Sequence, residues 1–163
     1  MAFLKTLQTI ISGQDLTELE MIDSMTQIME GKVSDTQLAA FLTALQTKKE
    51  TVPEIVGAAR VMRGKAEKVK VNASHIVDTC GTGGDGSDTF NISTAVAFIV
   101  AGAGVTVAKH GNRAVSSKSG SADVLKCLGV NIDASLPTVE RCIEEVGIGF
   151  LFAPLMHKAM KHA

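Results

Sequence analysis

Residues 80–94 read Cys-Gly-Thr-Gly-Gly-Asp-Gly-Ser-Asp-Thr-Phe-Asn-Ile-Ser-Thr, and they decide how the C-terminal half of this chain folds. Four glycines lie between an apolar stretch typical of a strand and another typical of a helix. Glycine, which has no side chain, is typical of positions where the backbone turns sharply or where a ligand approaches the backbone closely. Hydroxyl and amide side chains follow at the predicted helix start, where free N–H groups and the positive end of the macrodipole are exposed. We therefore predict an anion-binding loop, with phosphate as the anion.

The composition of the 163-residue chain is that of a globular protein, with 45% hydrophobic and 20% charged residues. A net charge of −1 argues against a general nucleic-acid-binding protein, which carries a basic excess. Three cysteines without metal-type spacing predict free thiols in a reducing cytoplasm. The chain opens without a secretory pattern, and its longest apolar stretch, residues 95–108, is too short to span a bilayer. We expect a cytoplasmic protein that binds neither nucleic acid nor membranes.

Residues 1–70 predict a small bundle of short helices. Apolar residues recur at intervals of mostly three and four between residues 16 and 29, as on one face of a helix. Two capping boxes predict the starts of the next helices, and they pair Ser34 with Gln37 and Thr51 with Glu54. We therefore assign residues 1–70 to an α-helical domain.

Strands and helices alternate from residue 75 onward. Strands are predicted at residues 75–79, 105–108, 130–133 and 148–152, and helices at residues 92–103, 121–128 and 137–146. The first strand is apolar enough to be buried. This alternation predicts a parallel sheet covered on both faces. The fold class is therefore α/β, with the helical domain followed by an α/β domain at residues 71–163 whose thin sheet looks incomplete.

The glycine loop also satisfies the G-x-G-x-x-G pattern of dinucleotide-binding folds at residues 81–86, but this pattern alone is weak. The full fingerprint requires an acidic residue about twenty positions further on. None occurs between Asp88 and Asp123, which disfavours a nicotinamide or flavin site. A P-loop is excluded because no Gly-Lys-Ser/Thr ends the loop. A glycine-rich turn without a ligand is the structural alternative.

A second polar loop at residues 109–123 follows the second predicted strand. In an open parallel sheet, ligands bind beyond the carboxyl ends of the strands, so both loops should reach the same crevice. This part of the chain carries Lys109, Arg113 and Lys118 and, before Asp123, no acidic residue. A local positive charge of this size suits a polyphosphate, although a solvated basic loop is the commoner reading of such a run.

Four motifs together resemble the anthranilate phosphoribosyltransferase family. They are Gly-Thr-Gly-Gly-Asp at residues 81–85, Asn-Ile-Ser-Thr at 91–94, Lys-His-Gly-Asn at 109–112 and Ser-Ser-Lys-Ser-Gly-Ser-Ala-Asp at 116–123. The resemblance covers essentially the whole chain. It implies a helical domain that joins two copies into a homodimer, and the first part of a parallel-sheet α/β domain of the nucleoside phosphorylase and phosphoribosyltransferase type.

The resemblance also implies a set of site residues. Phosphoribosyl pyrophosphate would contact Gly81, Gly84, Asp85, Thr89, Asn91, Ile92, Ser93, Thr94, Lys109, Asn112, Ser116, Ser117 and Ser121. Anthranilate would contact Gly81, His110 and Asn112, and Ser93 would ligate Mg²⁺. Lys109 and His110 would be the residues nearest the chemistry, although His110 taken alone is as well explained as an ordinary loop histidine. Cys80 is expected to be a buried thiol rather than a nucleophile.

By this resemblance, the amine of anthranilate displaces pyrophosphate from the anomeric carbon of the ribose. Backbone amides, Lys109 and Mg²⁺ would stabilise the leaving group, and the loops would align the reactants. No general base is nominated, because the aromatic amine becomes acidic as the new bond forms.

The chain departs from the family in its length. The family's anthranilate-binding arginine and its metal-binding Asp-Glu pair would lie beyond residue 163, and no Asp-Glu dipeptide occurs in this sequence. We therefore hypothesise a truncated product or fragment with low activity of its own. Two alternatives stay open: a non-catalytic phosphate-binding and dimerisation module, and a phosphoribosyl-handling enzyme of the same fold with another acceptor.

Overall fold

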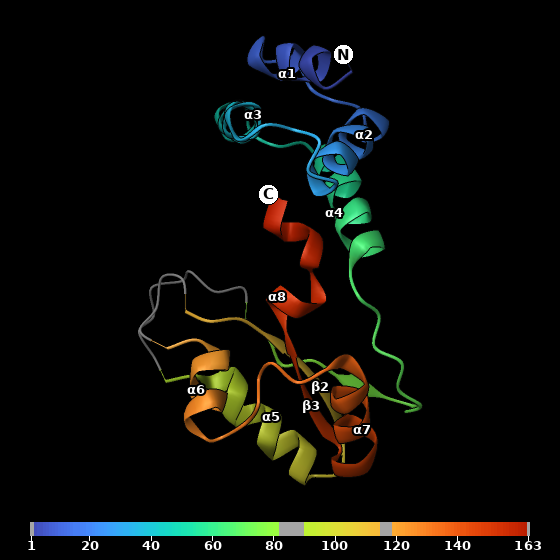
Figure 1. Cartoon of the computed structure of the whole chain (residues 1–163), viewed down its shortest axis with the longest axis vertical. Coiled ribbons are helices and arrows are strands. Elements are labelled where there is room, and N and C mark those ends of the chain that lie inside the picture. Colours follow the sequence, from blue (N-terminus) through green and yellow to red (C-terminus); the bar gives the residue numbers. More distant parts are fainter. Residues whose placement is uncertain (1, 82–89, 115–118, 163) are drawn as a thin grey trace. The chain divides into compact units, whose positions relative to one another are not determined.

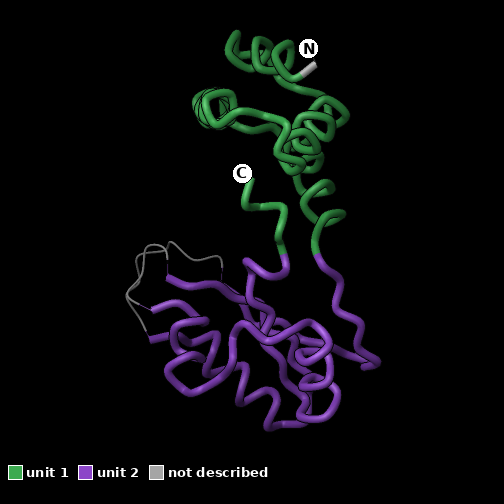
Figure 2. The backbone as a smooth tube through the Cα atoms, in the orientation of Figure 1, with its two compact units in different colours: residues 1–66, 157–163 green, residues 67–156 purple. Residues whose placement is uncertain are grey.

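The computed structural model describes residues 2–81, 90–114 and 119–162 and divides into two compact units (Figures 1 and 2). Unit 1 combines Met1–Ala66 with His157–Ala163, and unit 2 comprises Glu67–Met156. Among the helices of the described ranges, none has both the length and the hydrophobicity that crossing a membrane requires.

Unit 1 is a bundle of short helices, as predicted. Its elements are α1 (Ala2–Ile11), α2 (Glu18–Met29), α3 (Asp35–Lys48), α4 (Val52–Lys65) and the 3₁₀ turn η1 (Lys158–His162). The predicted cap at α3 is confirmed, because Ser34 Oγ accepts from Gln37 N at 3.4 Å while Gln37 Oε1 accepts from Ser34 N at 3.2 Å. A third capping box, Thr17 with Glu20, opens α2 and was not predicted.

One hydrophobic core holds unit 1 together. Helix α1 packs against α2 and α3, and α2 packs against α4 and η1. The fully buried side chains at its centre include Phe41, whose ring lies 5.3 Å from that of Phe3. The cluster consists of Phe3, Leu7, Ile10, Leu16, Met21, Ile28, Phe41 and Leu45.

Unit 2 is a parallel α/β unit. Its elements are β1 (Ile76–Val77), α5 (Ile92–Gly102), β2 (Thr106–Gly111), α6 (Ser121–Cys127), α7 (Leu136–Val146), β3 (Ile148–Phe152) and α8 (Ala153–Met156). The sheet order is β1-β2-β3 and both pairings are parallel, which confirms the predicted fold class. Helices α5 and α7 both pack against β2 and β3 (Figure 1).

The predicted strand at residues 130–133 is wrong. Gly129 ends α6 with a φ of +85°, and Asn131 Oδ1 then accepts a hydrogen bond from Asp133 N at 3.1 Å, which closes a turn. Ile132 alone points inward and joins Ala122, Leu125 and Phe152 in the core of unit 2. Ile132 therefore anchors a loop to the core, and residues 130–133 do not pair as a strand.

The first strand was predicted to span residues 75–79 and to be buried, and both expectations are wrong. β1 has two residues, and Ile76 and Val77 are 45% and 36% exposed. β1 lies at the edge of the described sheet, so only β2 pairs with it there. Cys80 follows it and is exposed instead of buried, although all three cysteines are free as expected.

Candidate functional site

The start of α5 brings together several of the predicted phosphate-binding residues. Asn91 caps this helix, because its Oδ1 accepts from Thr94 N at 3.0 Å. The same oxygen accepts from Ser93 Oγ at 3.2 Å and from Ser121 Oγ, at the start of α6, at 3.5 Å. Side chains separated by 30 residues in the sequence therefore meet at one point, beyond the carboxyl end of β2.

Thr94 carries an unused hydrogen-bonding group at this point. Its side chain is only 2% exposed, and its Oγ1 has no hydrogen-bond partner within the described ranges. A buried hydroxyl without a partner is costly. The N-terminus of α5 also favours a negative charge nearby. An anion bound here would gain both interactions.

Lys109 lies next to the segment that leads into the glycine loop. Its side chain is 2% exposed, and its Nζ donates to the carbonyl oxygen of Thr79 at 2.6 Å. Thr79 Oγ1 in turn donates to the carbonyl oxygen of Ser93 at 2.8 Å. Burial lowers the pKa of the Lys109 ammonium, while the negative charge of Asp78 acts in the opposite direction.

The loop between β2 and α6 is closed by Asp123. Its carboxylate accepts from the N–H groups of Ala114 and Gly120 at 2.9 and 3.0 Å, and these two bonds hold the pKa of Asp123 below its usual value. Ala122 N also donates to the carbonyl oxygen of Asn112 at 3.1 Å. The two ends of the loop are thereby fixed to the N-terminus of α6.

The predicted site residues fall into three groups. Asn91, Ser93, Thr94 and Ser121 meet directly, and Lys109 joins them through Thr79. Gly81, Ile92, His110 and Asn112 lie on the adjoining segments, with His110 N donating to Asp78 Oδ1 at 3.0 Å. The remaining predictions, at Gly84, Asp85, Thr89, Ser116 and Ser117, fall outside the described residues.

The sequence analysis missed Asp78 and Thr79 as contributors to this region, and it gave Asp123 no role of its own. The signal for Asp78 was present, because it lies near the carboxyl end of the strand predicted at residues 75–79, and polar residues at that end line the ligand-binding edge of a parallel sheet. The signal for Thr79 was weaker, since its carbonyl oxygen, a group common to all residues, makes the contact with Lys109.

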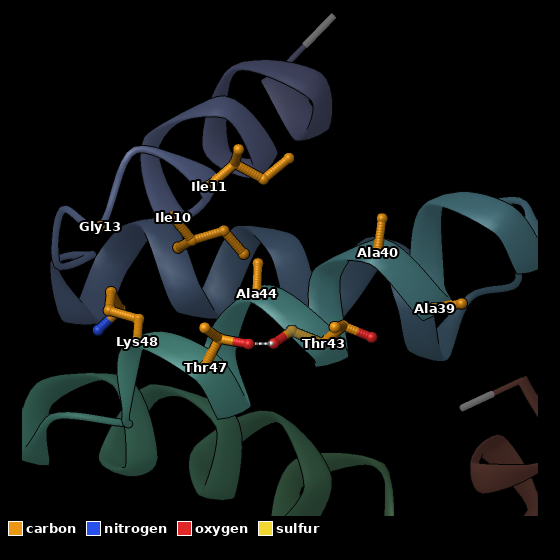
Figure 3. Close-up of a pocket in the computed structure, with 9 residues that line it drawn as sticks. All are labelled: Ile10, Ile11, Gly13, Ala39, Ala40, Thr43, Ala44, Thr47 and Lys48. Carbon is orange, nitrogen blue, oxygen red and sulfur yellow. Dashed lines mark hydrogen bonds between the residues drawn. The ribbon is translucent and has the colours of Figure 1, made fainter.

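A groove of about 660 Å³ lies elsewhere, between α1 and α3 of unit 1 (Figure 3). Its lining is mostly apolar and small, and comprises Ile10, Ile11, Gly13, Ala39, Ala40, Thr43, Ala44, Thr47 and Lys48. The single ionic side chain in this lining, Lys48, pairs with Asp15 and Glu54 at 2.7 and 2.9 Å. The groove therefore suits an apolar surface better than a phosphate, and we place the candidate ligand site in unit 2.

Two family models match the sequence over nearly all of its length. Residues 73–163 match the model described as "Glycosyl transferase family, a/b domain", and residues 4–66 match "Glycosyl transferase family, helical bundle domain". The chain belongs to this glycosyl transferase family. The matched ranges correspond to a helical bundle followed by the parallel sheet.

Similar proteins of this glycosyl transferase family are named anthranilate phosphoribosyltransferase. The protein from Acetivibrio thermocellus is 58% identical over 98% of this chain and 46% of its own length, and that from Alkaliphilus metalliredigens is 60% identical over 98% and 47%. These relatives confirm the resemblance carried by the four motifs. The chain spans about half the length of the curated relatives it matches.

Solved structures of anthranilate phosphoribosyltransferases also resemble this chain. The anthranilate phosphoribosyltransferase of Thermus thermophilus superposes with a TM-score of 0.86 at 44% identity, over 96% of this chain and 48% of that one. The Saccharomyces cerevisiae anthranilate phosphoribosyltransferase, solved in complex with PRPP and Mg, also superposes with a TM-score of 0.86. It is 30% identical, and the match covers 98% of this chain and 48% of that chain.

Proposed function

We propose that this chain contributes the phosphoribosyl pyrophosphate-binding half of an anthranilate phosphoribosyltransferase. The reaction transfers the phosphoribosyl group to the amine of anthranilate, releases pyrophosphate and serves tryptophan biosynthesis. The observation that carries the proposal is the cluster of Asn91, Ser93, Thr94 and Ser121 beyond the parallel strands, in a chain about 60% identical to enzymes of that name.

The phosphate groups would bind at the N-terminus of α5. The buried Thr94 hydroxyl supplies a donor that is not yet used, and the helix dipole favours the negative charge. The hydroxyls of Ser93 and Ser121, which donate to Asn91 Oδ1 in this structure, would turn to the phosphate when it binds. We propose that the cradle is completed by Gly81, Gly84, Asp85, Thr89, Ile92, Lys109, Asn112, Ser116 and Ser117. Lys109 would contribute its charge from beside Thr79, since its Nζ already contacts the Thr79 carbonyl oxygen.

Mg²⁺ is the proposed metal, and the residues present suit it in part. Ser93 Oγ and Asn91 Oδ1 are oxygen ligands of the kind that Mg²⁺ prefers. The described residues contain no group of three or more acidic, histidine or cysteine side chains that would form a protein cage. We propose Ser93 as a protein ligand, with phosphate oxygens and water in the other positions. Bound Mg²⁺ would neutralise charge on the leaving pyrophosphate.

Anthranilate would lie beside Gly81, His110 and Asn112, at the opposite side of the ribose from the leaving group. The backbone amide of His110 is fixed by Asp78, so the loop that carries Asn112 leaves β2 at a defined point. This positioning of the amine in line with the departing pyrophosphate supplies catalysis without a general base.

A homodimer joined through the helical domain, residues 1–70, is part of the proposal. The apolar groove between α1 and α3 supports it, as do Ile11 and Leu42, which are 64% and 50% exposed. A second copy would remove this apolar surface from water.

The test uses the fluorescence of anthranilate and the heat of ligand binding. Calorimetry should show phosphoribosyl pyrophosphate binding that pyrophosphate displaces. Incubation with phosphoribosyl pyrophosphate and Mg²⁺ should consume anthranilate only slowly, because the chain supplies one half of the enzyme. Asn91→Ala should weaken this binding at least tenfold, because its carbonyl organises three donors, whereas the exposed Asn72→Ala should not change it. Binding without any turnover would favour the non-catalytic phosphate-binding module. Turnover of another acceptor would favour a phosphoribosyl-handling enzyme of the same fold with a different acceptor.

A further inference from the structure

The pairing between β1 and β2 is short, and side chains extend it. The backbone ladder joins Ile76 to Thr106 and Val77 to Val107. Past this point, the β2 backbone donates to a side chain, since His110 N bonds Asp78 Oδ1 at 3.0 Å. The carboxylate thus holds a strand N–H that would otherwise lie at an open sheet edge.

Lys109 makes the second contact to the same segment. Its Nζ donates to the carbonyl oxygen of Thr79 at 2.6 Å, from a side chain that is 2% exposed. A buried ammonium is stable only when its hydrogen bonds are satisfied, so this contact is costly to break. Thr79 Oγ1 extends the connection to the first turn of α5 through the Ser93 carbonyl, at 2.8 Å.

We propose that Asp78 and Lys109 are positioning residues that clamp the backbone of residues 78–81 onto β2. The clamp fixes the point at which Cys80 and Gly81 leave the sheet, next to the N-terminus of α5. Besides the charge proposed above, Lys109 therefore acts on the ligand through the Thr79 carbonyl, and Asp78 acts through the His110 amide. The functional part of this inference rests on the proposed binding of phosphoribosyl pyrophosphate.

The clamp can be separated from a purely electrostatic role because Asp78 is negatively charged. Removing a carboxylate close to an anion site should strengthen anion binding if charge alone matters. If Asp78 positions the backbone, Asp78→Ala should instead weaken anion binding, since the bond to His110 N is lost. Asp78→Asn removes the same charge but keeps an oxygen that accepts from His110 N.

The experiment compares Asp78→Ala, Asp78→Asn and Lys109→Met with Asp133→Ala, an exposed acid in a turn of the same unit. Calorimetry measures affinity for phosphoribosyl pyrophosphate with Mg²⁺, and NMR relaxation measures backbone order at residues 79–81. Asp78→Ala and Lys109→Met should weaken binding about tenfold, as expected for a lost bond to a charged group. Asp78→Asn should bind as tightly as the unmodified chain or more tightly, and Asp133→Ala should not change affinity.

The order parameters give a readout that needs no ligand. At Cys80 they should fall from about 0.85 to below about 0.6 in Asp78→Ala and Lys109→Met, while those of β3 stay unchanged. Tighter binding by Asp78→Ala, unchanged order at Cys80, or loss of order throughout unit 2 would each overturn the clamp. If the unmodified chain does not bind phosphoribosyl pyrophosphate, the proposed function fails, and the order parameters alone decide whether the clamp exists.

Discussion

Glu54 is the most completely paired carboxylate in unit 1. It is 1% exposed and accepts from the backbone N–H groups of Leu16 and Thr51 at 2.8 and 2.7 Å and from Lys48 Nζ at 2.9 Å. Asp15, by contrast, meets Lys48 from a side chain that is 64% exposed. One lysine therefore has a buried and an exposed partner, which allows a matched comparison.

Glu54→Gln should lower the free energy of unfolding by about 3 kcal/mol, because it removes the buried carboxylate that pairs with the buried Lys48 side chain. Asp15→Asn should cost less than about 1 kcal/mol, since that carboxylate is solvated and its pairing is screened. Urea unfolding of the two variants measures both values. Equal losses would contradict the assignment of Glu54 as the structural member of the pair.

The same carboxylate predicts a pH dependence. Burial alone would raise the pKa of Glu54, but the hydrogen bonds from Leu16, Lys48 and Thr51 outweigh burial and hold it below 4.5. A carboxyl group with a lowered pKa in the folded state stabilises above its unfolded pKa, and this stability is lost as the pH falls. We expect unfolding free energy to fall as the pH drops below about 4.5, with a shallower slope in Glu54→Gln. Urea titrations between pH 3 and 7 would show parallel curves if Glu54 were not responsible.

At the scale of elements, Gly120 sets how closely the loop after β2 approaches α6. A Cβ at this position would lie 2.7 Å from the carbonyl oxygen of Asn112 and would overlap the backbone nitrogen of Ala114. Gly120→Ala should therefore destabilise unit 2 by about 2 kcal/mol and weaken ligand binding, because backbone must move. At Gly102, at the end of α5, an added Cβ would meet no atom within 4 Å. Gly102→Ala should therefore raise the free energy of unfolding by up to about 1 kcal/mol. Denaturant unfolding measures both, and a neutral Gly120→Ala would show that the loop can relax.

The elements also show what the sequence could predict. The cap at Ser34 and the helix end at Gly147, with a φ of +82°, follow from local rules, and both are present. The strand expected at 130–133 failed because periodicity does not register that Asn131 closes a turn. The clamp was missed for another reason, since the partner of Lys109 is a carbonyl oxygen 30 residues away, which no residue pattern marks.

At the scale of the whole molecule, the chain combines the candidate ligand site in unit 2 with an apolar groove in unit 1. Large exposed apolar surface is uncommon on a protein that acts alone. Leu4 and Leu42, on the two helices that form the groove, are 48% and 50% exposed, and Ile11 in its lining is 64% exposed. These side chains contribute little to the core of unit 1, so changing them tests association separately from folding.

Ile11→Lys should convert the proposed dimer into a monomer without unfolding it, because the lysine places a charge in a groove that a second copy would have to desolvate. Light scattering should give twice the 17.1 kDa chain mass for the unmodified protein and the chain mass for the variant. Leu19→Lys is the matched control, since Leu19 is 76% exposed on α2 and does not line the groove. It should remain dimeric. A monomeric unmodified chain, or dissociation by Leu19→Lys but not by Ile11→Lys, would move the interface away from α1 and α3.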